Sequence, residues 1–528
     1  MKKRLYCQME CVSKNKRHFP RGFNPLCCMD KGLKPLGRKG SLIYIRAFIL
    51  LLAALSLTSC TFDKTEKVID SKGYPEDIGK IILTQCAVPG CHNPFSKNAA
   101  GGLSMTTWEE LFEGTRDNSS VVPFRTDQSF MMFFINTFPD LGPSLPPQMP
   151  FNRTPLPRAD VELIRDWIEN GAPNSDGFVK FSDNPETRGK IYIINQGCDL
   201  VTVMDRETRL IMRYFDIGAR PGTESPHKTK ISPDGNYLYV CFFAGNMFQK
   251  FSTTDESLVG EVDLGEGSWN TFIITSDSKR AFVVNWSANG SVAVVDLENM
   301  RLLTTYQGNN LFIWPHGSVL SDDNTLYVTA QTGNFIYKVD VTDLFNPEIS
   351  QIVLQPGETP TAVQRYDPHD IHMSPDNSEY AVSCQHSNEV RFFDASNDSL
   401  IAVVPTGIFT QEIEYSKSTD YMFVSCMEDN VSFPGKVGAI TVIDYKTHTF
   451  VRNIYSGYQP HGLEVDDEKK LVYIANRNVN PNGPAPHHST DCGGRNGYLT
   501  IIDMNTMELV PGYKAELSVD PYYISVRD

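Results

Sequence analysis

The sequence predicts two folded domains, a small all-α domain followed by an all-β propeller of seven blades. Apolar residues at helical spacing occur before residue 173. After it, a strand, turn and strand pattern recurs with a period of roughly 40 to 60 residues, which is typical of propellers. The expected organisation is a leader and signal at 1–59, a tether at 60–75, the all-α domain at 76–173, a linker at 174–188 and the propeller at 189–528.

The N-terminal part of the chain predicts export. Basic residues after Met29 are followed by an apolar run of 11 residues at 47–57 and then by Thr58, Ser59 and Cys60. The run is too short to cross a bilayer core of about 30 Å but is typical of a cleaved signal peptide. It resembles a bacterial lipoprotein signal, which implies that Cys60 becomes the lipidated N-terminus. Residues 1–28 precede this complete signal, so we interpret them as the product of a start codon placed too far upstream.

The predicted mature chain is acidic. Residues 1–59 carry 12 basic and two acidic side chains, so removing their net charge of +10 from the total of −15 leaves −25. Such a surface disfavours nucleic acid and anionic lipid as partners. Membrane attachment would therefore depend on the lipid. Thr61, next to the lipidated cysteine, favours the outer membrane, with the protein facing the periplasm or the cell surface.

Two helices frame the predicted all-α domain. Residues 76–86 place Ile78, Ile81 and Ile82 on one face of a helix that delivers Cys86 to its end. The run PLPRADVELIRDWIENGA predicts a second helix with four apolar residues at i, i+3 and i+4 spacing and Gly171 at its C-terminal cap.

Cys86, Cys91 and His92 form the most informative cluster in the chain. Two thiols followed at once by an imidazole are what covalent attachment of a c-type haem requires. Four residues separate these cysteines, whereas the usual number is two. The alternative interpretation is a disulfide, or two buried thiols beside an unrelated histidine.

The run 76–173 resembles the planctomycete-type cytochrome c domain, through its CxxxxCH start, GGL segment, Met-Pro pair and closing WIENGA. The resemblance implies one covalent haem c held by Cys86 and Cys91, with His92 and Met149 as the ligands of the haem iron. A thioether ligand raises the potential of haem, so the pair suits electron transfer with a redox partner protein. Three other methionines compete with Met149 for this role, Met105, Met131 and Met132.

The second half of the chain contains six clear copies of the strand, turn and strand pattern, for example ISPDGNYLYV and MSPDNSEYAV. A third strand ending near an aspartate follows each copy, which predicts four-stranded blades. GKIYIINQ and LVTVMD near 189–205 supply outer strands that the final PYYISVRD completes, giving a seventh blade closed by the two ends of the domain. This half resembles the YVTN-type seven-bladed propellers.

Aligning the blades reveals one column of hydrogen-bonding side chains at the start of each innermost strand. The column consists of His227, Asn270, His316, His369, Gln411, His461 and Tyr522. Converging imidazoles bind copper, zinc or a haem iron well, so His227, His316, His369 and His461 predict a metal site or a second haem site. His316 and His369 are the expected best-placed pair, with His372 as a possible third ligand. The alternative is that the rings only bond neighbouring loop carbonyls.

Five cysteines lie outside the leader, the lipid anchor and the haem motif: Cys198, Cys241, Cys384, Cys426 and Cys492. An odd number in an oxidising compartment leaves at least one free thiol, which usually behaves as a small buried hydrophobe. Blade order brings the loops of Cys198 and Cys492 to one face, and we expect these two to form a disulfide.

The resulting functional prediction is a lipid-anchored c-type cytochrome that passes electrons to or from a partner protein, or a site on its own propeller. The sequence also allows two alternative functions. The first is a periplasmic oxidoreductase with a metal or a second haem at the histidine column. The second is a propeller that serves as a platform for binding protein or glycan.

Overall fold

The computed structural model describes residues 70–480, 482–485, 492 and 495–528. They belong to one compact unit, Ile69–Asp528. The predicted leader, signal peptide and Cys60 lie outside the described residues. Among the described helices, none has the length and apolar character needed to cross a membrane.

The first described segment is helical. Its elements are α2 (Glu76–Ile81), the π-helix η1 (Ile82–Cys86), the 3-10 helix η2 (Lys97–Ala99), α3 (Trp108–Leu111), η3 (Thr126–Gln128), α4 (Phe130–Ile135), η4 (Pro139–Leu141) and α5 (Arg158–Glu169). As expected, Cys86 ends the first helical stretch, and Gly171 follows α5 with a left-handed φ of 91°. The amide of Gly171 donates to the Ile168 carbonyl, which caps the helix.

The helical segment has its own hydrophobic core. The buried faces of α2 and α5 meet there, with Ile78 and Ile82 from α2 and η1 and Val161 and Ile168 from α5. Trp108 on α3 is buried in the same core and donates its indole N–H to the Ala172 carbonyl at 2.9 Å. The apolar periodicity of the sequence therefore predicts the faces that pack.

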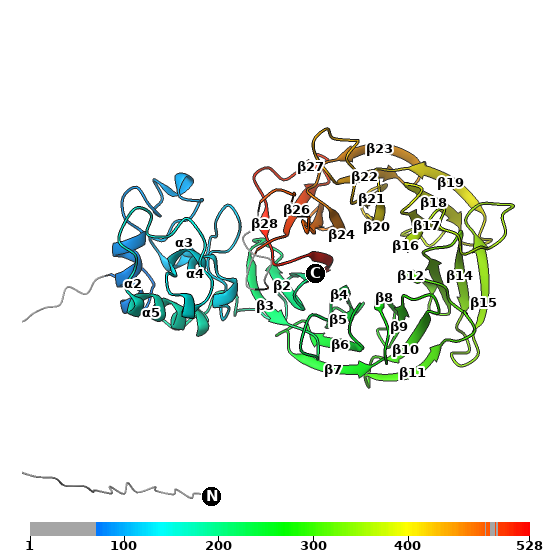
Figure 1. Ribbon diagram of the computed structural model, residues 1–528, viewed down its shortest axis with the longest axis horizontal. Helices are drawn as coiled ribbons and strands as arrows, with labels where there is room; N and C mark the ends of the chain where they lie inside the picture. The colour runs from blue at the N-terminus through cyan, green and yellow to red at the C-terminus, as the bar shows by residue number, and fades with distance from the viewer. Residues whose placement is uncertain (1–69, 481, 486–491, 493–494) are drawn as a thin grey trace, which may run out of the picture. The chain divides into compact units, whose positions relative to one another are not determined.

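The rest of the described chain is a seven-bladed propeller, as predicted (Figure 1). Blade 1 contains β29 (Pro521–Arg527), β1 (Lys190–Asn195), β2 (Leu200–Asp205) and β3 (Ile211–Asp216). Blade 2 contains β4 (Pro226–Ile231), β5 (Tyr237–Phe242), β6 (Met247–Ser252) and β7 (Leu258–Asp263). Blade 3 contains β8 (Trp269–Ile274), β9 (Arg280–Asn285), β10 (Ser291–Asp296) and β11 (Arg301–Tyr306).

The remaining four blades repeat the same antiparallel order. Blade 4 contains β12 (Pro315–Asp322), β13 (Thr325–Ala330), β14 (Phe335–Asp340) and β15 (Glu348–Val353). Blade 5 contains β16 (Pro368–Met373), β17 (Glu379–Cys384), β18 (Glu389–Asp394) and β19 (Leu400–Pro405). Blade 6 contains β20 (Thr410–Tyr415), β21 (Tyr421–Cys426), β22 (Ala439–Asp444) and β23 (Thr449–Ile454). Blade 7 contains β24 (Pro460–Asp466), β25 (Leu471–Asn476), β26 (Tyr498–Asp503), β27 (Glu508–Leu509) and β28 (Ala515–Glu516).

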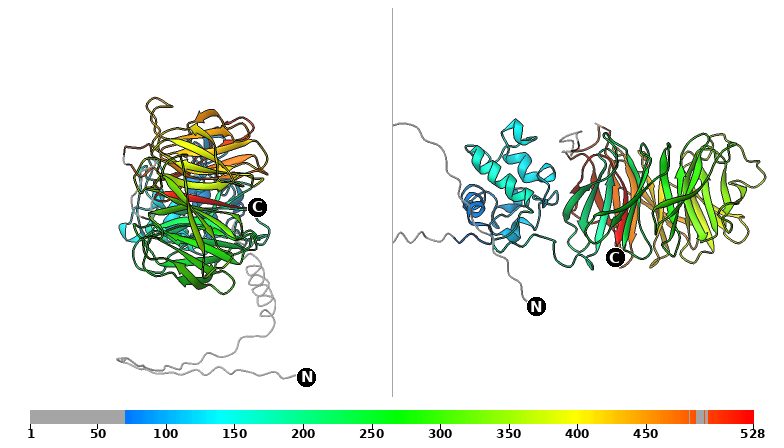
Figure 2. Two further views of the ribbon diagram at one scale, coloured as in Figure 1. Left: turned by 90° about the vertical axis from the view of Figure 1, so that its right-hand side faces the viewer. Right: turned by 90° about the horizontal axis from the view of Figure 1, so that it is seen from below.

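The ring is closed by pairing strands from opposite ends of the propeller. β29 pairs antiparallel with β1, with Ile193 opposite Ile524, so the last strand becomes the innermost strand of blade 1. Figure 2 shows this strand, in red, among the green strands of the first blades. Closure gives the innermost strand of blade 1 a partner, so this blade, like the other six, keeps only short edges at its inner and outer strands.

Seven buried clusters hold the blades together, one at each blade-to-blade interface among the described residues. The cluster between blades 7 and 1, for example, packs Tyr473 and Leu499 against Ile191 and Ile193. Because each strand alternates its side chains between two faces, both faces of a blade are buried and the strands are rich in β-branched residues. Cys241, Cys384 and Cys426 are buried free thiols at the ends of second strands, as expected.

Residues between α3 and α4 bond to the outer strand of blade 1. The Asn118 side chain donates to the Arg209 carbonyl at 2.9 Å and accepts from the Ile211 amide at 2.7 Å. Ser119 donates its hydroxyl to the Ile211 carbonyl at 2.7 Å. Val122 is part of the buried cluster between blades 7 and 1. The helical segment thus shares polar and apolar contacts with the closing blade.

The predicted disulfide between Cys198 and Cys492 is confirmed, and it joins positions 294 residues apart. Cys198 follows β1 in blade 1, and Cys492 lies in the long connection between β25 and β26 of blade 7. The covalent link therefore crosses the interface at which the ring closes.

Removing this disulfide is expected to destabilise the closed ring. Replacing Cys198 and Cys492 together by serine should lower the free energy of unfolding by about 2 to 4 kcal/mol, because the cross-link restricts the unfolded chain. Urea unfolding of oxidised protein measures the effect, and wild-type protein reduced before unfolding, which lacks the same cross-link, is the control. An unchanged stability of the double variant would show that strand pairing alone holds the closure.

Candidate functional site

The innermost strands of all seven blades begin with the same irregularity. In each, the hydrogen-bond register with the neighbouring strand shifts next to the second residue of the strand, as between Pro226 and Lys228 in β4. The second residue is the member of the predicted column. A β-bulge leaves such a residue outside the ladder and re-aims its side chain. The bulge therefore explains why the column side chains can meet one another.

The residue before each inner strand also constrains the direction of that strand. In six blades it has a left-handed backbone, with φ between 45° and 65°, as in Asp367 (58°) and Gln459 (56°). The carbonyl of this residue accepts a hydrogen bond from the residue that follows the second strand of its blade, for example Gln385 to Asp367. Proline comes next in five blades and fixes its own φ. The direction of each inner strand is thus set before the column residue.

The Pro-His-Gly sequences of blades 4 and 7 have a specific structural cause. A Cβ on Gly317 would lie 2.6 Å from the His369 carbonyl oxygen, and one on Gly462 would lie 2.4 Å from the Tyr522 carbonyl oxygen. These carbonyls are the acceptors of the ring Nδ1 atoms of His316, at 3.0 Å, and His461, at 3.2 Å. Glycine therefore lets the next inner strand approach closely enough to bond the histidine ring.

The four histidines of the column lie in contact with one another. The ring centroids of His316 and His369 are 4.0 Å apart, those of His227 and His316 are 5.8 Å apart, and those of His369 and His461 are 6.0 Å apart. Tyr522 completes the arc, with its hydroxyl 3.1 Å from His227 Nε2 and its ring 3.8 Å from that of His461. Imidazoles from blades 2, 4, 5 and 7 thus converge in one buried layer.

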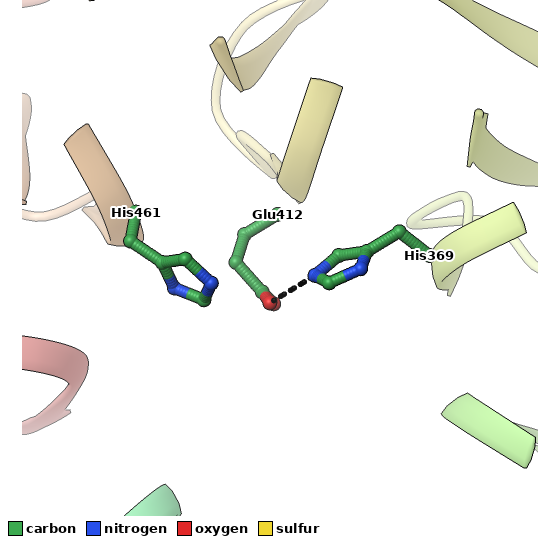
Figure 3. Close-up of side chains that lie close together, drawn as sticks. All are labelled: His369, Glu412 and His461. Carbon is green, nitrogen blue, oxygen red and sulfur yellow. Dashed lines mark ion pairs between the residues drawn. The ribbon is translucent and has the colours of Figure 1, made fainter. Parts of the chain in front are cut away.

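Within this layer, His369, Glu412 and His461 present three donor atoms to one point (Figure 3). One nitrogen of each histidine and one Glu412 carboxylate oxygen all lie within 4.8 Å of one another. The residues come from the consecutive blades 5, 6 and 7, and Glu412 lies between the two rings. His369 Nε2 is 3.5 Å from Glu412 Oε1. This set can hold a metal ion or share a proton.

Neighbouring residues fix how the rings are protonated. His461 Nδ1 faces the Tyr522 carbonyl, so this nitrogen carries the hydrogen and Nε2 keeps its lone pair. His369 Nδ1 faces the amide nitrogen of Gln331 at 3.3 Å. The indole N–H of Trp286 donates to the other end of that amide, which orients it. His369 Nδ1 is therefore an acceptor and Nε2 carries the hydrogen, and at 3.5 Å from Glu412 Oε1 this nitrogen makes no hydrogen bond.

His372 differs from the expectation that it would be the third ligand beside His316 and His369. Its Nε2 lies 3.2 Å from Asp370 and its Nδ1 lies 3.4 Å from Glu414. Burial lowers the pKa of His372, but these two carboxylates outweigh burial and raise it above its usual value. His372 lies three residues after the bulged position in β16, and the strand turns its side chain toward these carboxylates instead of toward the imidazole layer.

The imidazole layer itself is held neutral. Burial lowers the pKa of His227, His316 and His461 well below the usual value and that of His369 to about 4. Burial together with the nearby charge of Asp370 raises the pKa of Glu412 well above its usual value. A layer of neutral imidazoles therefore lies beside the charged pair of His372 and Asp370.

The predicted haem-binding cysteines lie in a compact turn. The amide of Cys91 donates to the Val88 carbonyl at 3.0 Å, and the amide of His92 donates to the Cys86 carbonyl at 3.1 Å. Gly90 has a left-handed φ of 83° and allows this turn. The four residues between the cysteines therefore loop out. Cys86 and Cys91 are both free thiols, so the disulfide alternative is wrong.

The groups expected to face the iron are half-buried. His92 has a buried Nδ1 with no hydrogen-bond partner, and burial lowers the pKa of its ring. Met149 packs against the same core as Cys86, and its amide donates to the Phe134 carbonyl at 2.8 Å. Arg153, four residues later, donates to the Gln85 carbonyl at 3.1 Å. The Met149 loop is thus tied to the residue before Cys86.

The three competing methionines are in a different environment from Met149. Met105, Met131 and Met132 are each at most 6% exposed and belong to the hydrophobic core of the helical segment. Met149 remains partly exposed. Of the four methionines, Met149 is the most exposed residue.

Comparisons with known proteins find structural similarity at low sequence identity. Hydrazine synthase from Kuenenia stuttgartiensis is 19% identical, with a TM-score of 0.45 over 58% of this chain and 93% of that chain. A functionally unknown protein from Desulfotomaculum acetoxidans is 13% identical, with a TM-score of 0.49 over 64% and 99%. The dihydro-heme d1 dehydrogenase NirN, in complex with DHE, is 12% identical, with a TM-score of 0.45 over 65% and 76%. No family model and no curated protein matches the sequence.

Two residues of the site, Glu412 and Gln331, are not predicted from the sequence. Glu412 directly follows Gln411, the one glutamine of the column, and its carboxylate reaches the layer from the next position of the strand. Gln331 is the first residue after β13. An alignment of the blades could have identified Gln331, because the equivalent residues of blades 2 and 3, Phe243 and Trp286, also border the layer.

The neutral imidazole layer predicts acid sensitivity. Below pH 6.5 an unfolded histidine takes up a proton that buried His227 cannot bind, so His227 should cost about 2 kcal/mol of stability between pH 7 and pH 5. His372 acts in the opposite sense, because its raised pKa contributes stability below pH 6.5 that is lost as the pH rises through the folded value. Urea unfolding should therefore show a smaller acid loss for His227→Gln and a larger one for His372→Gln than for wild type. Identical pH profiles would contradict this account of the layer.

Proposed function

We propose that the protein is an electron-transfer protein in which the helical segment carries one covalently attached haem c. The observation that carries the proposal is the turn formed by Cys86, Cys91 and His92, in which two free thiols and a half-buried imidazole lie together. Met149, on the loop tied to Gln85, supplies the second axial ligand.

The residues present fit such a group. His92 Nδ1 is a buried polar atom without a partner, which costs free energy unless something satisfies it. Phe95 is fully exposed just after His92, and Phe151 is largely exposed just after Met149. Exposed aromatic side chains on both flanks offer apolar surface to a large planar cofactor.

Haem with histidine and methionine ligation supplies reversible one-electron chemistry at a raised potential. The residues of the protein hold the attachment and ligand groups in fixed positions. The turn at 86–92 fixes the distance between the thiols and the imidazole, and Asn93 braces it by donating to the Val88 carbonyl at 2.8 Å and accepting from the Ser96 amide at 3.2 Å. A rigid ligand set favours electron transfer, because it lowers the rearrangement that accompanies a change of charge.

The proposal includes anchoring by lipid on Cys60 at a bacterial membrane, with the protein in the outer membrane and facing the periplasm or the surface. A redox partner protein would exchange electrons with the haem. The apolar run at 47–57 and the cysteine at its end support this placement.

Covalent attachment is tested by denaturing electrophoresis after acid-acetone extraction. Protein matured in the periplasm should keep its haem stain, and the Cys86→Ala, Cys91→Ala double variant should lose it completely, because the thioether bonds are gone. Cys241→Ala, which removes a buried thiol of the propeller, should stain like wild type. Haem that extracts entirely from the wild-type protein would rule out covalent attachment.

The axial methionine is tested by spectroscopy of the ferric protein. Met149→Ala should abolish the weak near-infrared sulfur-to-iron band and lower the reduction potential, since the thioether stabilises ferrous iron. Met132→Leu, a core substitution of similar volume, should keep both properties. A band that survives in Met149→Ala would assign the ligand to another methionine.

A further inference from the structure

Among the buried polar atoms of the inner strands that lack a hydrogen-bond partner, three lie close together in the imidazole layer. His369 Nε2, His461 Nε2 and Glu412 Oε2 have no hydrogen-bond partner. Their residues are 3%, 0% and 4% exposed, and their donor atoms point at one another. Leaving a buried polar atom unsatisfied costs free energy, so three such atoms at one point indicate that something else satisfies them.

The geometry suits a metal ion. Tetrahedral ligands at 2.0 to 2.2 Å from zinc lie about 3.4 Å from one another. The three donor atoms are already within 4.8 Å of one another, so modest side-chain rotations bring them to bonding distance. Two imidazoles and one carboxylate are a donor set that both Zn²⁺ and Fe²⁺ accept, with further coordination positions left open.

The His461 side of the site is preorganised. The Tyr522 carbonyl accepts the Nδ1 hydrogen of His461 at 3.2 Å, and the Tyr522 ring stacks on the imidazole at 3.8 Å between centroids. This arrangement directs the Nε2 lone pair toward Glu412. A carbonyl on the second nitrogen is the partner that metal-bound histidines usually have.

The His369 side needs one local change. Ligation through Nε2 places the ring hydrogen on Nδ1, where it faces the NH₂ group of Gln331 at 3.3 Å. The Gln331 amide must then turn its oxygen toward His369 and give up the hydrogen bond from Trp286. A glutamate at position 331 would accept from both groups at once. Gln331 is therefore a positioning residue, and its replacement by glutamate should tighten metal binding.

We propose that His369, Glu412 and His461 bind one divalent transition-metal ion, Zn²⁺ or Fe²⁺, in the imidazole layer of the propeller. The site is separate from the predicted haem ligands and does not depend on them. It uses residues from three consecutive blades, so the bound ion also links blades 5, 6 and 7. The histidine column alone implies neither this ligand set nor the carboxylate.

The test is metal titration of the full-length protein after removal of metal by a chelator. Calorimetry with Zn²⁺ should show one site per chain, and His461→Ala and Glu412→Gln should each weaken its affinity at least a hundredfold. His448→Ala removes another histidine paired with a carboxylate, Glu379 at 2.8 Å, and should leave the affinity unchanged. Gln331→Glu should tighten binding about tenfold, within the range known for second partners of metal-bound histidines.

Cobalt substitution separates this site from the cysteine turn. Co²⁺ at His369, Glu412 and His461 should give visible d–d bands without the near-ultraviolet charge-transfer bands of thiolate ligation. Anaerobic titration with Fe²⁺ should compete with Co²⁺ for the same site. Absence of Zn²⁺ uptake, uptake unchanged by His461→Ala, or thiolate bands that vanish in the Cys86→Ala, Cys91→Ala variant would each overturn the proposal. Thermal unfolding of every variant establishes that the propeller is folded.

Discussion

The pairing of β29 with β1 is the constraint on which the rest of the propeller depends. It makes a strand from the end of the domain the innermost strand of blade 1, and it brings Tyr522 between His227 and His461. The buried ion pair of Arg206 with Asp466, at 2.6 Å, ties blade 1 to blade 7 beside this closure. Because each inter-blade core is shared by two neighbours, an open ring would expose two of these apolar faces. Closure thus stabilises the fold and assembles the imidazole layer in one step.

Much of this architecture could be predicted from the sequence because it repeats. Alternating apolar residues and Asp-rich turns predict the blades, and the same alignment places His227, His316, His369 and His461 at equivalent positions. Glu412 could not be found in this way, because its position in the other inner strands holds residues as different as Lys228 and Gly317. The bulge that re-aims the column depends on strand pairing, which a single sequence does not show. For the helical segment, the sequence predicts that Cys86 ends the first helical stretch and that Gly171 caps α5. It does not predict the turn formed by Cys86, Cys91 and His92, and the haem ligand set remains a prediction.

Charged and neutral side chains are separated by depth along the inner strands. The first layer holds imidazoles that burial keeps neutral, with lowered pKa values. Further along the strands, Asp370 and His372 form an ion pair. Burial raises the pKa of Asp370, but the charges of His372 and Lys228 and the hydrogen bond to His372 together outweigh burial and lower it. A buried charge is costly unless it is paired, and here the partner lies two residues away on the same strand. Neutral imidazoles and a charged pair can therefore coexist a few residues apart.

The closure also determines at which stage of folding the imidazole layer can form. Tyr522 bonds to His227 across 295 residues of sequence, and the carbonyl that holds His461 belongs to the same tyrosine. Contacts between such distant residues form late, because the intervening chain must first be ordered. Blades 2 to 6 can collapse on one another while the layer is still missing its last side chain. The complete layer, with His461 oriented by the Tyr522 carbonyl, can therefore form only after β29 has paired with β1 and the propeller has closed.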